Sequence, residues 1–317
     1  MATSLRRIWI DLLLYPAHTL PTAAAPILVA AGLAIHDRVF NPVPTIAAFL
    51  GSWLIHVAGV FADNHELLRR YPSVVEHPDL TNALADGSLT LNHIRFAIAA
   101  CLVLAVPVAI FFLRIGGVPA LVLGVVGVAA SIGYAAGPIP YTKLGIAEPV
   151  FFAMFGVVAV AGTYYAQLAW LAATSGTSAS FGDLPPAAFV AGLPVGALVT
   201  NVLFIDDLRD RRFDAAKGWR TVAVRLGPRA SRAAYVAMLA LAYAAPLACW
   251  ATGRFDAWIL LPLSTSPWAA LIARAVLSHD DPEALALMTA RASLLACAYA
   301  ALWGLGLAIG WEAAPLC

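Results

Sequence analysis

Residues 187–221 read AAFVAGLPVGALVTNVLFIDDLRDRRFDAAKGWRT. The first part of this stretch is apolar over a length that crosses a bilayer as a helix, about 17–25 residues. A dense block of charge follows at once, from Asp206 to Arg220. This abrupt boundary predicts a transmembrane helix that ends at one face of a membrane and carries its charges there.

The composition of the whole chain supports that interpretation. Of 317 residues, 62% are hydrophobic and only 12% are charged, whereas soluble domains carry roughly 25% charged residues. These values predict an all-α, polytopic membrane protein that forms a single domain over residues 1–317. The net charge is +1, which gives no indication of a nucleic-acid partner.

The remaining apolar stretches extend this prediction to nine transmembrane helices. They cover residues 18–35, 43–62, 95–113, 118–137, 150–171, 187–205, 232–252, 256–274 and 291–310. The eighth is the weakest, because Pro262 and Pro267 interrupt it, although neighbouring helices compensate for the bonds that a proline removes.

The basic residues indicate an orientation. With nine crossings and a cytoplasmic N-terminus, all 19 Lys and Arg residues except Arg38, Arg114 and Arg254 fall on the cytoplasmic side. This asymmetry follows the positive-inside rule. It places two charged cap segments, residues 63–94 and 206–231, in the cytoplasm. We therefore expect an integral membrane protein whose N-terminus and two charged cap segments face the cytoplasm.

Three acids in the second cap segment, Asp206, Asp210 and Asp214, are spaced four residues apart. On a helix this spacing brings each carboxylate to nearly the same face. Carboxylates in a row repel one another unless a cation lies between them. We predict that they bind Mg²⁺ and a phosphate-bearing substrate, with help from the nearby cations Arg209, Lys217 and Arg220. The alternative is a membrane-flanking loop with solvated charges.

The first cap segment offers a second acidic pair. Asp63 and Glu66 are three residues apart at the end of the second predicted span, so they can share a helical face. If they face the first row, the two sets complete a two-metal clamp on a diphosphate. An ordinary helix end with solvated charges is the alternative, and His65 is expected to face the surface or lipid headgroups.

Three further segments supply candidate substrate contacts. The Gly- and Pro-rich stretch 133–148 predicts a fixed, irregular loop, from which Lys143 would reach a phosphate and Tyr141 would contact a ring. Within the spans, Tyr165 and Asn201 place polar groups that either face a cavity or bond to neighbouring helices.

Several of these residues also resemble a known family. The run from Asp210 to Gly227, Asp-x-x-x-Asp-x-x-x-Gly-x-Arg-Thr-Val-Ala-Val-Arg-Leu-Gly, resembles the second aspartate-rich motif of the UbiA intramembrane prenyltransferases. Residues 18–26 (HTLPTAAAP), 137–141 (GPIPY) and 156–165 (GVVAVAGTYY) resemble its menaquinone branch, the 1,4-dihydroxy-2-naphthoate prenyltransferases. The matches run from about residue 12 to 230.

The resemblance implies a helical bundle with a central, lipid-open cavity capped by the two acidic segments. It implies that a polyprenyl group moves from its diphosphate to the aromatic ring of a quinone precursor such as 1,4-dihydroxy-2-naphthoate. It also implies a bacterial cytoplasmic (inner) membrane, with the active site open to the cytoplasmic side. In this scheme Asp210 and Asp214 hold Mg²⁺ on the diphosphate, Lys217 and Arg220 neutralise the leaving group, and Lys143 assists. Tyr141 and Tyr165 are candidates to stabilise the allylic cation.

The chain departs from the family pattern mainly in the first motif. The family reads Asn-Asp-x-x-Asp, often with another Asp four residues on, where this chain has Ala62, Asp63, Glu66 and Arg70. In the second motif, acids stand at 206 and 207 where asparagines are expected. Two other functions therefore stay open: a family member with a different acceptor or a terpene-cyclase activity, and a non-catalytic protein that binds or transports prenyl lipids.

Overall fold

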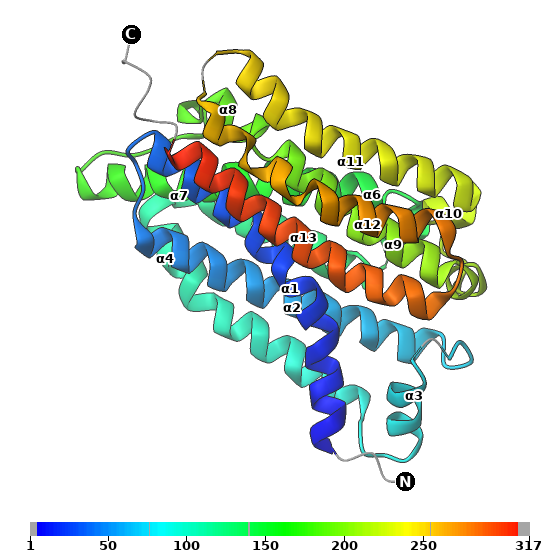
Figure 1. Cartoon of the computed structure of the whole chain (residues 1–317). Helices are drawn as coiled ribbons and strands as arrows, with labels where there is room; N and C mark the ends of the chain where they lie inside the picture. Colours follow the sequence, from blue (N-terminus) through cyan, green and yellow to red (C-terminus); the bar gives the residue numbers. More distant parts are fainter. Residues whose placement is uncertain (1–4, 76, 139, 254, 310–317) are drawn as a thin grey trace.

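The computed structural model describes residues 5–75, 77–138, 140–253 and 255–309, and these ranges contain helices and no strand. The all-α prediction is confirmed for this part of the chain. Most of the long helices lie side by side, with α3 and α10 at one end of the bundle and α8 at the other (Figure 1). The helical elements are α1 (Leu5–His36), α2 (Pro42–Arg70), α3 (Pro78–Ala85), α4 (Leu91–Gly133), α5 (Tyr141–Leu144), α6 (Ala147–Phe151), the π-helix η1 (Phe152–Val158), α7 (Ala159–Thr174), the 3-10 helix η2 (Phe181–Asp183), α8 (Pro186–Val190), α9 (Leu193–Lys217), α10 (Val222–Arg225), α11 (Gly227–Ala251), the 3-10 helix η3 (Ala257–Thr265), α12 (Ser266–Ser278) and α13 (Pro282–Ile309).

Seven helical segments of the described residues are long and apolar enough to cross a membrane, rather than the nine that the sequence predicted. Two of the predicted spans share the single segment α4, which contains all of 95–113 and the part of 118–137 up to Gly133. A third, 18–35, falls within α1, whose apolar part Leu20–His36 is shorter than the others. The span that Pro262 interrupts begins as a 3-10 helix and becomes α-helical only at Ser266.

Helix α4 is divided at Gly117 into two legs. This glycine has φ 60° and ψ −151°, a conformation that only glycine adopts readily. On the first leg, Ile94 shares a cluster with Phe61 of α2, and Val108 lies against Gly51. On the second leg, Ser131 donates a hydrogen bond to the carbonyl of Ile55, 2.8 Å away. The legs therefore run in opposite directions along α2.

Helix α9 is the central element of the bundle. In the most apolar part of the span Pro186–Lys217, which comprises α8 and α9, 83% of residues are buried, against 6% in α4. Glycines bring η1 close to α9, since a Cβ on Gly196 would stand 2.7 Å from the carbonyl oxygen of Phe152. Such small residues allow tight helix crossings in membranes. Helix α4 instead exposes Phe96, Val103 and Val118, as expected of a surface that faces hydrocarbon.

Candidate functional site

A cavity of about 850 Å³ opens between α2, both legs of α4, η1, α7 and α9. Its volume lies within the usual range for small-molecule sites. Along α2 it extends from Ala48 to Asn64, so it runs for much of the length of the bundle. Its walls are mainly apolar, and the charged residues of its lining gather at the end where α2 and α9 finish. We call this end the acidic mouth.

The acidic mouth is built from two helix ends. Helix α2 contributes Asp63 to the lining, and α9 contributes Asp206, Asp210 and Asp214. The four-residue spacing on one uninterrupted helix places the three α9 acids on the same wall, and the fold brings Asp63 to the same cavity. Carboxylates near helix C-termini face the negative end of the helix dipole. The arrangement therefore favours cations at the mouth.

Helix α9 ends at a glycine cap directly below this row of acids. Gly218 has φ 73°, and its N–H bonds to the carbonyl of Ala215, 3.1 Å away. This left-handed conformation suits glycine. The chain then turns back so that the N–H of Trp219 bonds to the carbonyl of Asp214 at 2.8 Å, and the indole joins the cavity wall. The turn after α9 thus adds Trp219 to the wall of the mouth.

Two basic side chains neutralise the α9 acids. Arg209 also lines the cavity; its Nη1 lies 2.6 Å from Asp206 Oδ1, and its Nε donates to Asp210 Oδ1 at 2.8 Å. Lys217 is buried, with Nζ 3.1 Å from Asp214 Oδ1 and 3.8 Å from the centre of the Trp219 ring. The three carboxylates therefore already have partners, and among the described residues no group of three or more His, Cys, Asp or Glu is arranged to hold a metal ion by itself.

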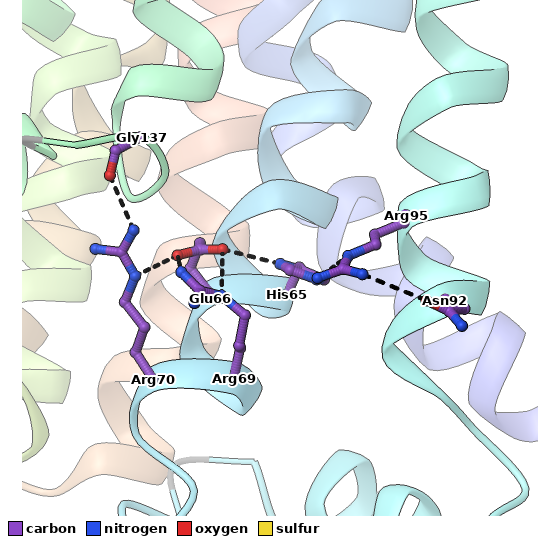
Figure 2. A network of polar contacts seen from close by, with 7 residues as sticks. All are labelled: His65, Glu66, Arg69, Arg70, Asn92, Arg95 and Gly137. Carbon is purple, nitrogen blue, oxygen red and sulfur yellow. Dashed lines mark hydrogen bonds and ion pairs between the residues drawn. The ribbon is translucent and has the colours of Figure 1, made fainter.

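Glu66 takes part in a separate ion-pair network (Figure 2). Its carboxylate accepts bonds from Arg69 Nε at 3.0 Å and Nη2 at 2.6 Å, and it also pairs with Arg70 Nε. Arg70 Nη2 in turn donates to the carbonyl of Gly137, 2.9 Å away. Glu66 is not part of the cavity lining. Its carboxylate thus ties the end of α2 to the Gly- and Pro-rich loop.

The prediction that His65 faces the surface or headgroups is wrong, because its side chain is buried in the same network. Arg95 Nε donates to His65 Nε2 at 3.0 Å, so that nitrogen is an acceptor and the imidazole is neutral. The proton is then on Nδ1, which donates to Glu66 Oε1, 3.0 Å away. The burial arises because α4 packs against α2 at this level, a contact that the local sequence does not reveal.

Two of the predicted aromatic contacts line the cavity at different depths. Tyr141 lies at the mouth and donates its hydroxyl to the carbonyl of Ala130 at 2.8 Å. Burial and the nearby Asp63 charge raise the pKa of Tyr141 above its usual range, so the phenol stays protonated. Tyr165 lies deeper and donates to the carbonyl of Gly116, also at 2.8 Å. The Tyr141 ring is partly exposed, whereas Tyr165 is buried and its ring packs against Phe181.

The other predicted contacts lie outside the cavity lining. Lys143 has its Nζ 5.5 Å from the centre of the Tyr71 ring. Arg220 is exposed, and its backbone N–H bonds to the carbonyl of Thr142 at 3.2 Å. Asn201 is 2% exposed, and neither of its side-chain polar atoms has a hydrogen-bond partner within the ranges that the structure describes. The sequence analysis proposed these three residues as substrate contacts, but none of them belongs to the cavity lining.

Several lining residues escaped the sequence analysis. Asn64 Nδ2 and Trp219 Nε1 are buried donors at the acidic mouth that have no partner in the described part of the chain, which suits them to bond an anion such as a phosphate. Asp207 interacts with Glu148, whose Oε1 accepts the N–H of Val222 at 2.7 Å. In the sequence, only the positions of Asn64 next to Asp63 and of Trp219 next to Gly218 indicated that these two residues could lie at the site. The contact between Asp207 and Glu148 joins segments far apart in the chain.

Comparison with known proteins identifies the family. The model of the UbiA prenyltransferase family matches residues 23–295. The 1,4-dihydroxy-2-naphthoate octaprenyltransferase of Haemophilus influenzae is 25% identical over 92% of this chain and 93% of its own length. The Escherichia coli enzyme of that name is 25% identical over 86% of both chains. A UbiA homologue from Aeropyrum pernix K1 shares the fold, with a TM-score of 0.60 at 19% identity over 91% of this chain and 97% of its own. This chain therefore belongs to the UbiA prenyltransferase family.

Proposed function

We propose that the protein transfers a polyprenyl group from its diphosphate to 1,4-dihydroxy-2-naphthoate. The observation that carries this proposal is the cavity itself. Its mouth carries several aspartates together with Arg209, and its interior is long and apolar. A polyprenyl diphosphate has the same division between a charged head and a hydrocarbon tail. The names of the Haemophilus influenzae and Escherichia coli relatives support the naphthoate acceptor.

We further propose that Mg²⁺ binds at the acidic mouth together with the diphosphate. The oxygen donors there suit this ion, which proteins usually hold through one or two carboxylates plus substrate phosphates rather than in an all-protein cage. Asp63, Asp210 and Asp214 are the proposed ligands, with Asp206 beside them. Glu66 is left out because it does not line the cavity, and its carboxylate pairs with Arg69 and Arg70 outside it. The ion would stabilise the charge that develops on the leaving diphosphate.

The protein's own residues would complete the reaction. Arg209 and the two unpartnered donors, Asn64 Nδ2 and Trp219 Nε1, are placed to bond diphosphate oxygens. As the bond between C1 and the diphosphate oxygen breaks, the apolar walls keep water from the allylic cation, and the ring of Tyr141 offers its π face. An acceptor carbon then bonds to C1, and a carboxylate or water takes the ring proton.

For the membrane arrangement we propose nine crossings, with the acidic mouth toward the cytoplasm of a bacterial inner membrane. The break at Gly117 supports two crossings by α4 in place of one, because its legs run in opposite directions. The apolar segment Leu20–His36 supplies the other. The basic residues support the orientation, since all but three would lie on the cytoplasmic side.

The product of the reaction tests this proposal. Purified full-length protein in lipid nanodiscs with Mg²⁺, a polyprenyl diphosphate and 1,4-dihydroxy-2-naphthoate is expected to yield a prenylated naphthalene product, identified by mass spectrometry. Parallel reactions contain 4-hydroxybenzoate as acceptor or no acceptor. A prenylated benzoate alone would overturn the naphthoate assignment, and a cyclised hydrocarbon without any acceptor would show a terpene cyclase instead.

A further inference from the structure

His56 lines the cavity but has no role in the proposed reaction as described above. It lies seven residues before Asp63 on α2, and both side chains line the cavity. Seven residues are nearly two helical turns, so His56 lies about 10 Å deeper than Asp63 on the same face. Its ring stands edge-to-face with Phe155, with 5.9 Å between the ring centres. His56 is therefore a polar group in the apolar part of the cavity.

The Nε2 atom of His56 is buried and has no hydrogen-bond partner among the described residues. Other polar side chains on nearby parts of the wall do have partners, since Ser131 bonds to Ile55 and Tyr141 bonds to Ala130. A buried polar atom left unsatisfied destabilises the protein, whereas phenylalanine or leucine would fill the same space without that cost. The imidazole is therefore best explained by a ligand that completes its hydrogen bonding.

The chemistry of the two substrates indicates which of them bonds to His56. The prenyl chain consists of hydrocarbon and has no atom that hydrogen-bonds to an imidazole. The diphosphate belongs at the acidic mouth, two helical turns away. The aromatic acceptor must bring its reacting carbon within about 3–3.5 Å of C1 of the donor, just inside the mouth. An acceptor such as 1,4-dihydroxy-2-naphthoate carries its two hydroxyl groups on the reacting ring, next to the carbons that react. These hydroxyls are hydrogen-bond donors, and one of them can point deeper into the cavity.

We propose that His56 binds the aromatic acceptor by accepting a hydrogen bond from a ring hydroxyl at Nε2, and so sets the acceptor's depth and orientation in the cavity. This inference rests on the proposed prenyl transfer and deepens it, because it assigns one residue to recognition of the acceptor. It makes His56 a specificity-determining residue that contacts substrate. It also predicts that acceptors lacking the hydroxyl are poorly recognised.

The test compares His56→Phe with the unaltered protein in nanodiscs. For 1,4-dihydroxy-2-naphthoate we expect the variant to raise the acceptor KM about tenfold or more, which corresponds to about 1.4 kcal/mol. The KM for the polyprenyl diphosphate should stay within about twofold, because the donor's head binds elsewhere. The thermal unfolding midpoint of the substrate-free variant should not fall, since the change removes an unsatisfied buried atom.

A matched control and a substrate series separate recognition from packing. His36→Phe is the control, since His36 also has a buried, unpartnered ring nitrogen and stacks on Phe255 but does not line the cavity. It should leave the acceptor KM unchanged. The substrate series uses 1-hydroxy-2-naphthoate and 4-hydroxy-2-naphthoate, each of which lacks one hydroxyl. The one that lacks the hydroxyl bound by His56 should have a high KM with the unaltered protein. Its KM should not rise further in His56→Phe, because its hydrogen bond to His56 is already absent.

The outcomes distinguish this inference from the proposed function. If the unaltered protein transfers prenyl groups to no naphthol, the proposed function fails. If it does transfer them, the inference about His56 is overturned by either of two results. One is an unchanged KM for 1,4-dihydroxy-2-naphthoate in His56→Phe. The other is an equal rise in KM, from the unaltered protein to His56→Phe, for both monohydroxy acceptors.

Discussion

Replacement of Asp210 by alanine is expected to lower the rate of diphosphate release from a polyprenyl diphosphate by about 10³-fold, or roughly 4 kcal/mol of activation free energy. Asp210 is the middle acid of the α9 row, and it lines the cavity beside Arg209. Its loss removes a proposed metal ligand and also removes one of the carboxylates that pair with Arg209. The measurement is the initial rate of diphosphate release at saturating donor and acceptor.

Two controls make this result specific to the site. Asp79→Ala removes an exposed acid of α3 that does not line the cavity, and it should leave the rate unchanged. Calorimetric titration of Mg²⁺ in the presence of a non-ionisable thiolodiphosphate analogue should show weaker metal binding for Asp210→Ala than for Asp79→Ala. An Asp210→Ala protein with an unaltered rate would refute the assignment of Asp210 to the metal.

The two acids of the first cap segment are expected to differ sharply when each is converted to its amide. Asp63→Asn should lower the rate by about 10²-fold or more, because it neutralises the one acid that α2 contributes to the mouth. Glu66→Gln should keep the rate within about threefold, because Glu66 pairs with Arg69 and Arg70 outside the lining. Its expected effect is on stability, since it leaves two arginines without their carboxylate.

The two variants are compared by rate and by thermal unfolding in the same nanodiscs. The expected pattern is a slow but normally stable Asp63→Asn protein and an active but less stable Glu66→Gln protein. If Glu66→Gln is as slow as Asp63→Asn, then Glu66 acts in the reaction and its pairing with the arginines breaks when substrate binds. That outcome would restore the symmetric two-motif clamp.

Local spacing in the sequence was sufficient to predict the α9 wall of the site. Asp206, Asp210 and Asp214 share a face because they lie on one regular helix, and a four-residue period determines that face without knowledge of the fold. Membership of the UbiA family was likewise predicted from the motif around Asp210, and the family match confirms it. Neither result required information about contacts between distant segments.

The roles of the α2 residues depended on such contacts and were harder to predict. Spacing alone allowed Glu66 to face the mouth with Asp63, but the arginines one turn later draw its carboxylate away. The burial of His65 depends on Arg95 from α4. A single histidine within an apolar span matches no motif, so a role for His56 could not be predicted from the sequence. Only the assembled cavity shows that its Nε2 is enclosed and unpartnered.

The count of spans illustrates the same limit. Hydropathy separated residues 95–113 from 118–137, and the break at Gly117 falls between them. Whether such a break is a kink or a reversal depends on how each leg packs. The contacts of Val108 and Ser131 with α2 show a reversal, a feature that no local pattern specifies.

Acceptor-dependent release of diphosphate tests the central claim most directly. Purified protein is incubated with a polyprenyl diphosphate and Mg²⁺, with and without 1,4-dihydroxy-2-naphthoate, and free diphosphate is measured over time. We predict rapid release only when the naphthoate and Mg²⁺ are both present, and loss of release when the metal is chelated. Equal release without the acceptor, or none with either substrate set, would contradict the assignment of this cavity to prenyl transfer.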